Sequence, residues 1–307
     1  MNISIREISQ SEYQSLTTNW EKKLPLWLSP KLITCYQDKK CLVAYRGNYP
    51  VGVWVVPMER KIARRRFRHF PYASPFLLEQ DNLKRREVVY GLLKHLIENC
   101  AEINLPFDPD FTDLAPVQGL GAFVEWRHTH LLKNPLEYQK MPSRLRNHIK
   151  NAQKLVRIVS GFDQDQFNFE AAIKGVEEER QARKENAVNL LNNHQAIIFS
   201  ALKNKNLCGG IFISFDSDNA YLMHSWQTKS TPRGTMSALI YEGVNWILTE
   251  KLLRQFDFEG SLFQQIDYYY SGFNAEIRPY GHVFWNKEKD RLFAMVEKSI
   301  NIPGRLF

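Results

Sequence analysis

Residues 41–56 read CLVAYRGNYPVGVWVV, an apolar run, a Gly-Asn turn and a second apolar run. Such a pattern predicts a β-hairpin, because a two-residue turn between strands requires residues that accept positive φ. Residues 196–215, AIIFSALKNKNLCGGIFISF, repeat the pattern with a Lys-Asn turn. A repeat of such long period indicates two similar lobes rather than one continuous domain.

The similarity between the two halves extends beyond the hairpins. Each hairpin is followed by a further strand, an amphipathic helix and a strand that ends in Phe-Asp, at Asp108 and at Asp257. We therefore expect an α+β fold with the order β-β-β-α-β in each lobe and a cleft between the lobes. The boundaries are placed at residues 1–140 and 141–307, and the chain up to about Leu32 is expected to be helical.

The composition is that of a globular protein. The 307 residues are 44% hydrophobic and 24% charged, which excludes disorder as the general state. The N-terminus lacks the basic and apolar regions of a signal peptide, and no apolar run approaches the ~18 residues of a membrane span. The four cysteines have no zinc-site spacing. We expect a cytoplasmic protein with reduced thiols and no integral membrane segment.

The net charge of +8 is concentrated in two segments. Residues 60–69, RKIARRRFRH, contain six Arg or Lys, and residues 142–157 form a predicted helix that carries Arg144 among its basic side chains. Both segments could attract a phosphate-rich partner through their charge. The alternative, a solvated hairpin tip and a solvated helix face, carries similar weight.

Two pairs of carboxylates are candidates for proton transfer. Asp257 and Glu259 are two residues apart at a strand end, so we expect their side chains on one face, where repulsion raises one pKa. Asp108 and Asp110 occupy the same places in the first lobe. The alternative is structural: Asp257 and Glu259 fix the corner by accepting backbone N–H bonds, and Ser261 caps the next helix.

Several segments resemble one known family. The corner FDFEGS at residues 256–261 and SGFNAEIRPY at 271–280 are similar to the carboxy-terminal pattern of the FemAB-like branch of the GNAT acyltransferase superfamily. Residues 106–121 and 141–154 also resemble that branch. This resemblance implies two GNAT-like lobes, each a mixed, mainly antiparallel sheet flanked by helices, in proteins related to peptidoglycan aminoacyltransferases.

The resemblance also implies a chemistry, the transfer of an acyl or aminoacyl group to an amine acceptor. The donor is then a coenzyme A thioester or an aminoacyl-tRNA, and the acceptor a cell-wall precursor or a similar amine. The donor's phosphates are expected at the helix start formed by Arg233, Gly234, Thr235 and Ser237. Only one glycine stands in this corner, and an ordinary turn and helix cap is the alternative.

The remaining expectations concern the acceptor, the metal and competing functions. Ser261, Tyr268 and Arg144 are assigned to substrate binding. The histidines show no metal-ligand spacing, so we expect no metal. The long helical arm of the tRNA-dependent members is absent from residues 163–195, which weakens the case for tRNA as a partner. A non-catalytic protein that binds phosphate or nucleic acid on the same fold is the alternative function.

Overall fold

The computed structural model describes residues 3–36, 38–64, 70–133, 135–173, 175–260 and 264–288. The strands of the first half are β1 (Ile3–Ile8), β2 (Lys39–Arg46), β3 (Tyr49–Glu59), β4 (Ile62–Arg64), β5 (Phe76–Leu77), β6 (Glu102–Pro106) and β7 (Phe123–Lys133). Its helices are α1 (Gln10–Thr17), α2 (Asn82–Asn99) and α3 (Ala115–Gly119).

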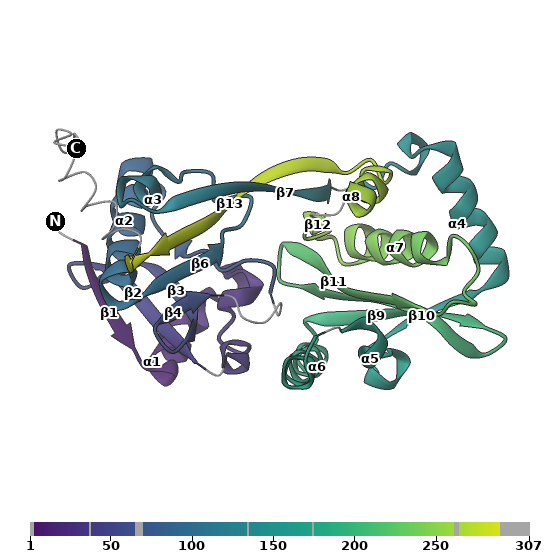
Figure 1. Ribbon diagram of the computed structural model, residues 1–307, viewed down its shortest axis with the longest axis horizontal. Coiled ribbons are helices and arrows are strands. Elements are labelled where there is room, and N and C mark those ends of the chain that lie inside the picture. Colours follow the sequence, from purple (N-terminus) through teal and green to yellow (C-terminus); the bar gives the residue numbers. More distant parts are fainter. Residues whose placement is uncertain are drawn as a thin grey trace.

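The second half contains the remaining regular elements (Figure 1). Its strands are β8 (Arg157–Gly161), β9 (Ala196–Lys203), β10 (Asn206–Phe215), β11 (Asn219–Gln227), β12 (Gln255–Asp257) and β13 (Glu276–Asn286). Its helices are α4 (Ser143–Leu155), α5 (Phe169–Ala172), α6 (Glu177–Asn192), α7 (Thr235–Asn245) and α8 (Gln264–Ser271). Short helical turns are η1 (Thr18–Lys23), η2 (Leu26–Leu28), η3 (Ile33–Cys35), η4 (Tyr138–Lys140), η5 (Gln164–Gln166) and η6 (Trp246–Glu250).

The order of elements expected in each half is confirmed. In the first half β2, β3 and β4 precede α2 and β6, and in the second half β9, β10 and β11 precede α7 and β12. Both predicted hairpin turns have positive φ, at Gly47 in the first and at Asn204 and Lys205 in the second. The expectation of a helical start is wrong in part, because β1 precedes α1 and pairs with β2.

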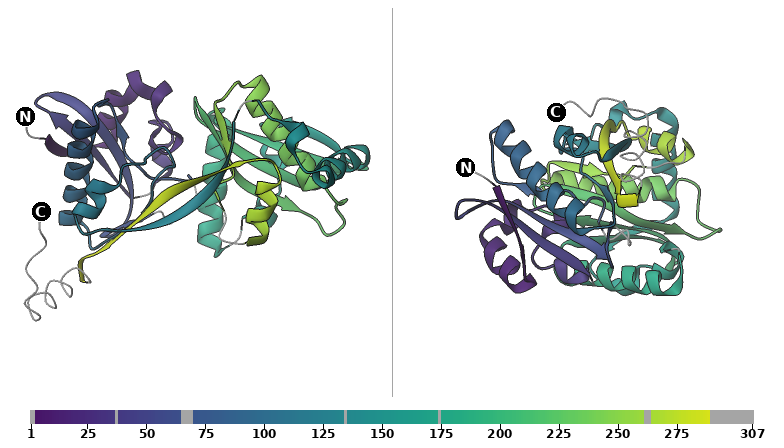
Figure 2. Two further views of the ribbon diagram at one scale, coloured as in Figure 1. Left: turned by 90° about the horizontal axis from the view of Figure 1, so that it is seen from above. Right: turned by 60° about the vertical axis from the view of Figure 1, so that its left-hand side comes forward.

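The two halves exchange strands. β13 comes from the second half of the sequence, yet it pairs with β6 on one side and with β7 on the other. The far end of β7 in turn pairs with β12 through Leu131–Lys133. In Figure 2, β7 and β13 run together as a long ribbon from one half to the other. The exchange joins the strands into one sheet path, so the relative position of the halves is fixed by backbone hydrogen bonds.

One hydrophobic cluster contains side chains of both halves. Trp27 and Tyr72 of the first half meet Tyr221 of β11, with ring centroids 6.3 Å and 6.4 Å from that of Tyr221. Phe212 of β10 belongs to the same cluster and is fully buried. The opposite face of the second sheet is covered by α7, against which α4 packs. Within the described ranges, no helix combines the length and the hydropathy needed to cross a bilayer.

Candidate active site

A cavity of about 230 Å³ lies between the two halves. Residues of the first half, from Lys23 to Phe111, form one side, and residues of the second half, from Asp216 to Asp257, form the other. The charged side chains that line it are Lys23, Arg85, Asp108, Asp110, Asp216, Asp218, Arg254 and Asp257. Acidic groups outnumber basic ones, so the cavity suits a cation such as a protonated amine.

Asp257 ends β12, and its side chain is only 2% exposed. Its Oδ2 accepts a hydrogen bond from the Tyr72 hydroxyl at 2.8 Å. Its Oδ1 accepts from the Glu259 amide at 2.7 Å and from the Thr129 hydroxyl. Burial raises the pKa of Asp257 to about 6, and the Asp108 carboxylate adds to this, although the three hydrogen bonds lower it. A carboxyl group with such a pKa can accept and return a proton near neutral pH.

Asp108 repeats this geometry in the first half. Its Oδ1 accepts from the Asp110 amide at 2.9 Å, two residues ahead, as Asp257 does from Glu259. Its Oδ2 accepts from the Ser74 hydroxyl. Burial raises the pKa of Asp108 and the nearby Asp110 carboxylate raises it further, while the bond from Ser74 lowers it. The structural role considered for the acidic corners is therefore observed in both halves: each aspartate holds its own turn.

A third aspartate of the cavity, the half-buried Asp216, was not among the predicted site residues. Its Oδ2 accepts from the Leu26 amide at 3.1 Å and from the Tyr221 hydroxyl, and its Oδ1 accepts from the amides of Asp218 and Asn219. Burial raises the pKa of Asp216 to about 6. The sequence signal was present, because Asp216 follows Phe215 and so repeats the Phe-Asp pair of the other two sites.

The expectation that Asp257 and Glu259 share one face is wrong. β12 ends at Asp257, and Glu259 adopts a left-handed conformation with φ of +62°, so the alternation of a strand does not continue. Asp257 lines the cavity and Glu259 does not. Asp110 is exposed and forms an ion pair with Arg254 at 2.6 Å. Of the four predicted acids, Asp108, Asp110 and Asp257 thus meet around one cavity.

The second half contains a parallel pair of strands of unequal length. β11 pairs with β12 only from Asn219 to Tyr221, although β11 continues to Gln227. Its register with β10 also shifts between Phe212 and Ile213, which marks a β-bulge. After Tyr221, the edge of β11 that is paired with β12 has no partner strand among the described residues. The chain then passes through a loop into α7.

α7 begins at a glycine where any side chain would be strained. Gly234 is the N-cap with φ of +89°, and a Cβ there would lie 2.5 Å from the backbone oxygen of His148 in α4. No side chain of the described residues caps this helix start. The Thr235 amide donates to the Pro232 oxygen at 3.2 Å, so the amides that follow it in the first turn remain to bind an anion, which the helix dipole also favours.

The predicted phosphate-binding residues surround this helix start. Arg233 is exposed, and Thr235 is buried with its hydroxyl bonded to the Pro232 oxygen at 2.7 Å. The buried Ser237 hydroxyl is 2.9 Å from that of Tyr269 in α8. Burial lowers the pKa of His148, and the charges of Arg233 and of the exposed Arg144 lower it further. Positive charge from α4 therefore adds to that of the loop before α7.

The other predicted residues are either exposed or outside the described part of the chain. Tyr268 is 82% exposed on α8, whereas Tyr269 and Tyr270 pack inward. Ser261 lies outside the described residues, as do residues 65–69 of the basic hairpin segment. The described part of that segment includes β4, where Arg64 forms an ion pair with Glu59. A role for these residues in substrate binding stays a prediction.

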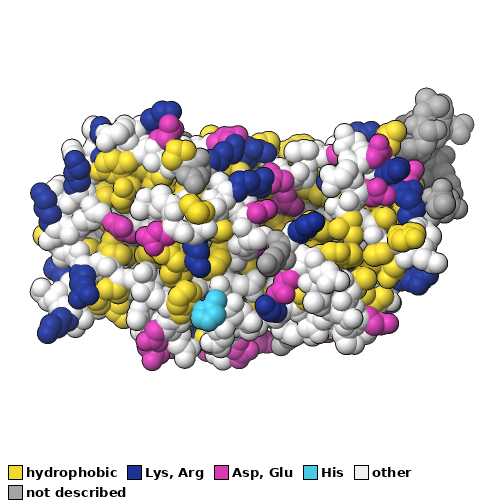
Figure 3. Space-filling model, turned by 180° about the vertical axis from the view of Figure 1, so that it is seen from behind, with side chains coloured by type: hydrophobic (Ala, Val, Ile, Leu, Met, Phe, Trp, Pro, Cys, Tyr) yellow, Lys and Arg dark blue, Asp and Glu magenta, His cyan; other side chains and the backbone are white. Residues whose placement is uncertain are grey.

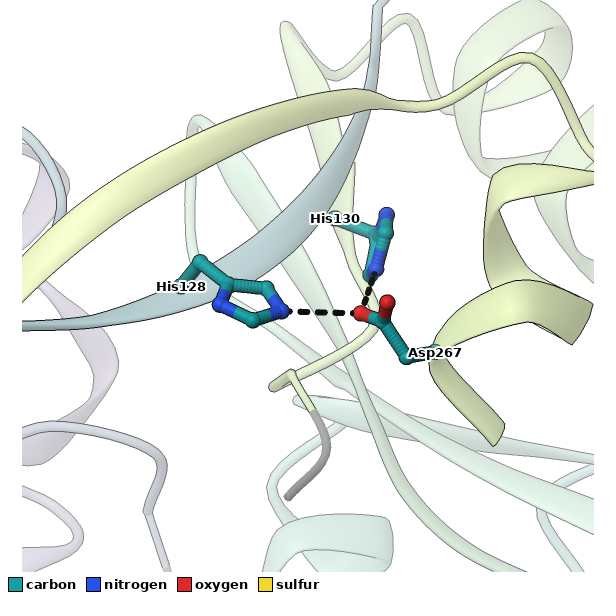
Figure 4. A group of neighbouring side chains, drawn as sticks. All are labelled: His128, His130 and Asp267. Atoms are coloured by element: carbon teal, nitrogen blue, oxygen red, sulfur yellow. Dashed lines mark hydrogen bonds and ion pairs between the residues drawn. The ribbon is translucent and has the colours of Figure 1, made fainter. Parts of the chain in front are cut away.

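A further group of polar side chains lies on the other face of β7 from Thr129. His128 and His130 project from the strand toward Asp267 in the first turn of α8 (Figure 4). The Asp267 Oδ1 atom is 2.8 Å from Nε2 of His128 and 2.6 Å from Nε2 of His130. These two hydrogen bonds, with that from His130 the stronger, hold the pKa of Asp267 below its usual value. The ligand atoms of the three residues lie within 4.8 Å of one another.

Comparison with known proteins defines the class of fold. The chain has the GNAT fold in a form with two lobes. The C-terminal DUF2156 domain assigned to a lysylphosphatidylglycerol synthetase from Agrobacterium fabrum is similar with a TM-score of 0.63 and 12% identity, over 97% of this chain and 99% of that one.

Two further solved structures show the same likeness. FemX matches with a TM-score of 0.60 and 11% identity over 94% of this chain and 99% of its own. A tandem GNAT protein from the clavulanic acid biosynthesis pathway matches with a TM-score of 0.58 and 12% identity over 92% of this chain and 98% of its own. The sequence matches no protein-family model and no curated protein. The likeness therefore lies in the fold, which agrees with the resemblance seen in the sequence.

Proposed function

We propose that this protein is an acyl- or aminoacyltransferase. In this proposal the second half binds an activated acyl donor at the start of α7, and an amine enters through the acidic cavity between the halves. The observation that carries the proposal is the position of Asp257. Its side chain lines the acidic cavity, while its strand β12 pairs with β11, the strand that precedes α7.

The donor side of the proposal rests on the phosphates that both donor types carry. Coenzyme A and tRNA each present phosphate groups, and the uncapped start of α7 with Arg233 offers free amides and a positive charge. In this proposal the acyl group lies beside the part of β11 that extends past the end of β12. The solved structures with the same fold include a tandem GNAT protein and FemX, which supports a donor of this kind.

The acceptor side rests on the carboxyl groups that line the cavity. An amine attacks a thioester or ester only when it is deprotonated, so the enzyme must remove its proton. A carboxylate at Asp257, with its pKa near 6, accepts that proton; the free amine then adds to the carbonyl carbon. The new C–N bond replaces the bond to the thiol sulfur or tRNA oxygen, and the leaving group departs with a proton. We further propose that the acceptor is an amine of a cell-wall precursor or a similar compound.

Calorimetry with the full chain tests the proposal. The protein is titrated with acetyl-coenzyme A, with longer acyl thioesters and with charged tRNA, and an amine panel is then added and screened for amides by mass spectrometry. We expect one donor class to bind and Arg233→Ala to weaken it about tenfold, as loss of one charge-assisted hydrogen bond predicts. Arg157→Ala, which removes another exposed basic residue, serves as the control. Failure of both donor classes to bind would contradict the proposal.

One observation favours a second function, a binding protein for phosphate or nucleic acid. α4 presents the exposed basic side chains Arg144, Lys150 and Lys154 beside the start of α7. By contrast, basic and acidic side chains are mixed across the face shown in Figure 3, so that face does not suit a polyanion. Binding through α4 alone predicts an affinity that falls about tenfold or more between low and physiological salt, without any amide product.

A further inference from the structure

We propose that His128, His130 and Asp267 form a binding site for a divalent transition-metal ion, with Zn²⁺ as the best fit. The inference departs from the expectation of no metal and does not depend on the proposed transfer reaction. It rests on three side chains that come from two elements far apart in the sequence, the strand β7 and the helix α8.

The backbone explains why the ligands converge. His128 and His130 are two residues apart on β7, so both rings project from the same face, whereas Thr129 between them projects from the other and reaches Asp257. Asp267 lies in the first turn of α8. Its Oδ1 atom accepts a hydrogen bond from Nε2 of His128 at 2.8 Å and another from Nε2 of His130 at 2.6 Å. Both rings and the carboxylate therefore point to one position (Figure 4).

The donor set suits a particular class of metal. Two imidazole nitrogens and one carboxylate oxygen are ligands that Zn²⁺ takes in proteins with one position left for water. Mg²⁺ and Ca²⁺ prefer all-oxygen ligands, so the two imidazoles disfavour them. A metal ion at the point of convergence would replace the two protons that the Nε2 atoms now direct at Asp267.

Burial around the three ligands leaves a route for the ion. The His130 side chain is fully buried, that of Asp267 is 29% exposed and that of His128 is 45% exposed. The open side of the cluster thus lies at His128, where a metal ion and its water can enter. Within the described residues the Nδ1 atom of His130 has no hydrogen-bond partner, so the outer support of this ligand is incomplete. Because such outer contacts contribute about tenfold or more to affinity, we expect an exchangeable metal.

The neighbouring contacts show what the ion would hold in place. Gly260 packs so closely on β7 that a Cβ there would lie 2.3 Å from the His128 oxygen. In α8, Tyr270 lies edge-on to His130 and stacks on Phe258, while Tyr269 reaches Ser237 in the first turn of α7. A metal bound by β7 and α8 would therefore fasten α8 against the start of α7.

Titration of tag-free, EDTA-treated full-length protein with Zn²⁺ tests the inference, with Co²⁺ absorption as a second readout. We expect one equivalent to bind, a rise in Tm and the visible bands of a Co²⁺ site with few ligands. His128→Ala should weaken Zn²⁺ binding by more than about tenfold, because it removes a direct ligand. His194→Ala, at an exposed histidine elsewhere, is the matched control and should bind as the unmodified protein does.

Asp267→Asn separates a metal site from a hydrogen-bonded cluster. Its amide oxygen still accepts bonds from the imidazoles but ligates metal poorly, so Zn²⁺ binding should fall while the Tm in EDTA stays nearly unchanged. The inference is overturned if no Zn²⁺ binds to the unmodified protein. It is equally overturned if His128→Ala and Asp267→Asn bind Zn²⁺ as tightly as His194→Ala.

Discussion

The helix α2, which precedes β6, and the helix α7, which precedes β12, begin in different ways. α2 begins after Asp81, whose carboxylate accepts a hydrogen bond from the Lys84 amide at 2.9 Å. α7 begins after Gly234, and no described side chain caps it. The first helix start is therefore already occupied by an anion of its own chain, whereas the second is open to one from outside. Two halves with one topology thus differ in their capacity to bind a phosphate.

The acidic corners differ less than the helix starts. Asp108 and Asp257 both accept an amide two residues ahead and both line the cavity. What distinguishes them is the neighbouring sheet. β12, which ends at Asp257, pairs with β11 in the half with the uncapped α7, and β6, which precedes Asp108, belongs to the half with the capped α2. We therefore expect the proton-transfer role to fall to Asp257.

The largest expected effect is the loss of transfer in Asp257→Asn. Removal of a general base lowers rates by about 10²–10⁴-fold, and the single amide oxygen can still accept the bonds from Glu259 and Thr129 that Oδ1 accepts now. Asp108→Asn is the matched variant of the first half, and its transfer rate should fall by less than about tenfold. Steady-state rates of both, with the donor that binds, measure the difference. Equal losses would remove the distinction between the two corners.

Substitution of Gly234 is expected to have the next largest effect. Gly234→Ala combines a positive φ with a contact of 2.5 Å to the backbone of His148, and should lower the free energy of unfolding by more than about 2 kcal/mol. Gly47→Ala has a positive φ but nothing within 4 Å, so it should lose only about 1 kcal/mol. Urea denaturation of both variants checks this, and a neutral Gly234→Ala would show that α4 does not pack as described.

The junction between the halves should make stability depend on pH. The pKa of Asp216 is about 6 in the folded protein against an ordinary value of 3.8. Because the folded state binds the proton more tightly, the contribution of Asp216 is fully present below pH 3.8 and is lost as pH rises through about 6. Between pH 3.8 and about 6, the urea midpoint should therefore fall less in Asp216→Asn than in the unmodified protein. An unchanged pH profile in the variant would contradict a raised pKa at Asp216.

The smallest expected effect concerns the cap of α2. Asp81→Ala should lower the free energy of unfolding by about 1 kcal/mol, because the Lys84 amide loses its acceptor. Asp81→Asn serves as the control, since asparagine caps helices about as well as aspartate. Thermal unfolding of the three proteins measures the difference. A loss of similar size in Asp81→Asn would mean that charge rather than the hydrogen bond stabilises this helix start.

Local patterns in the sequence predicted most of the fold. The turns at residues 47–48 and 204–205 and the repeated order of elements follow from short-range rules of φ and hydrogen bonding. The exchange of β7 and β13 was not predicted, because nothing within a strand's own sequence determines which half supplies its partner. β1 was missed because its short run, ISIREI, was included in the helical pattern that follows it.

The candidate site was predicted only in part. Asp108, Asp257 and the start of α7 each belong to a recognisable local motif. Tyr72 reaches Asp257 across 185 positions, and the Asp267 carboxylate reaches His128 across 139, so these contacts depend on tertiary structure. The i, i+2 spacing of His128 and His130 on a strand was the available signal for the second cluster.

The central claim is that the two halves have one topology but only the second binds the donor. Hydrogen exchange of the amides at residues 82–85 and 234–237, with and without acyl-coenzyme A or charged tRNA, compares the two helix starts directly. Slower exchange at 234–237 alone is the result expected from the uncapped helix. Slower exchange at 82–85, or no change at either helix start with both donors, would contradict the claim.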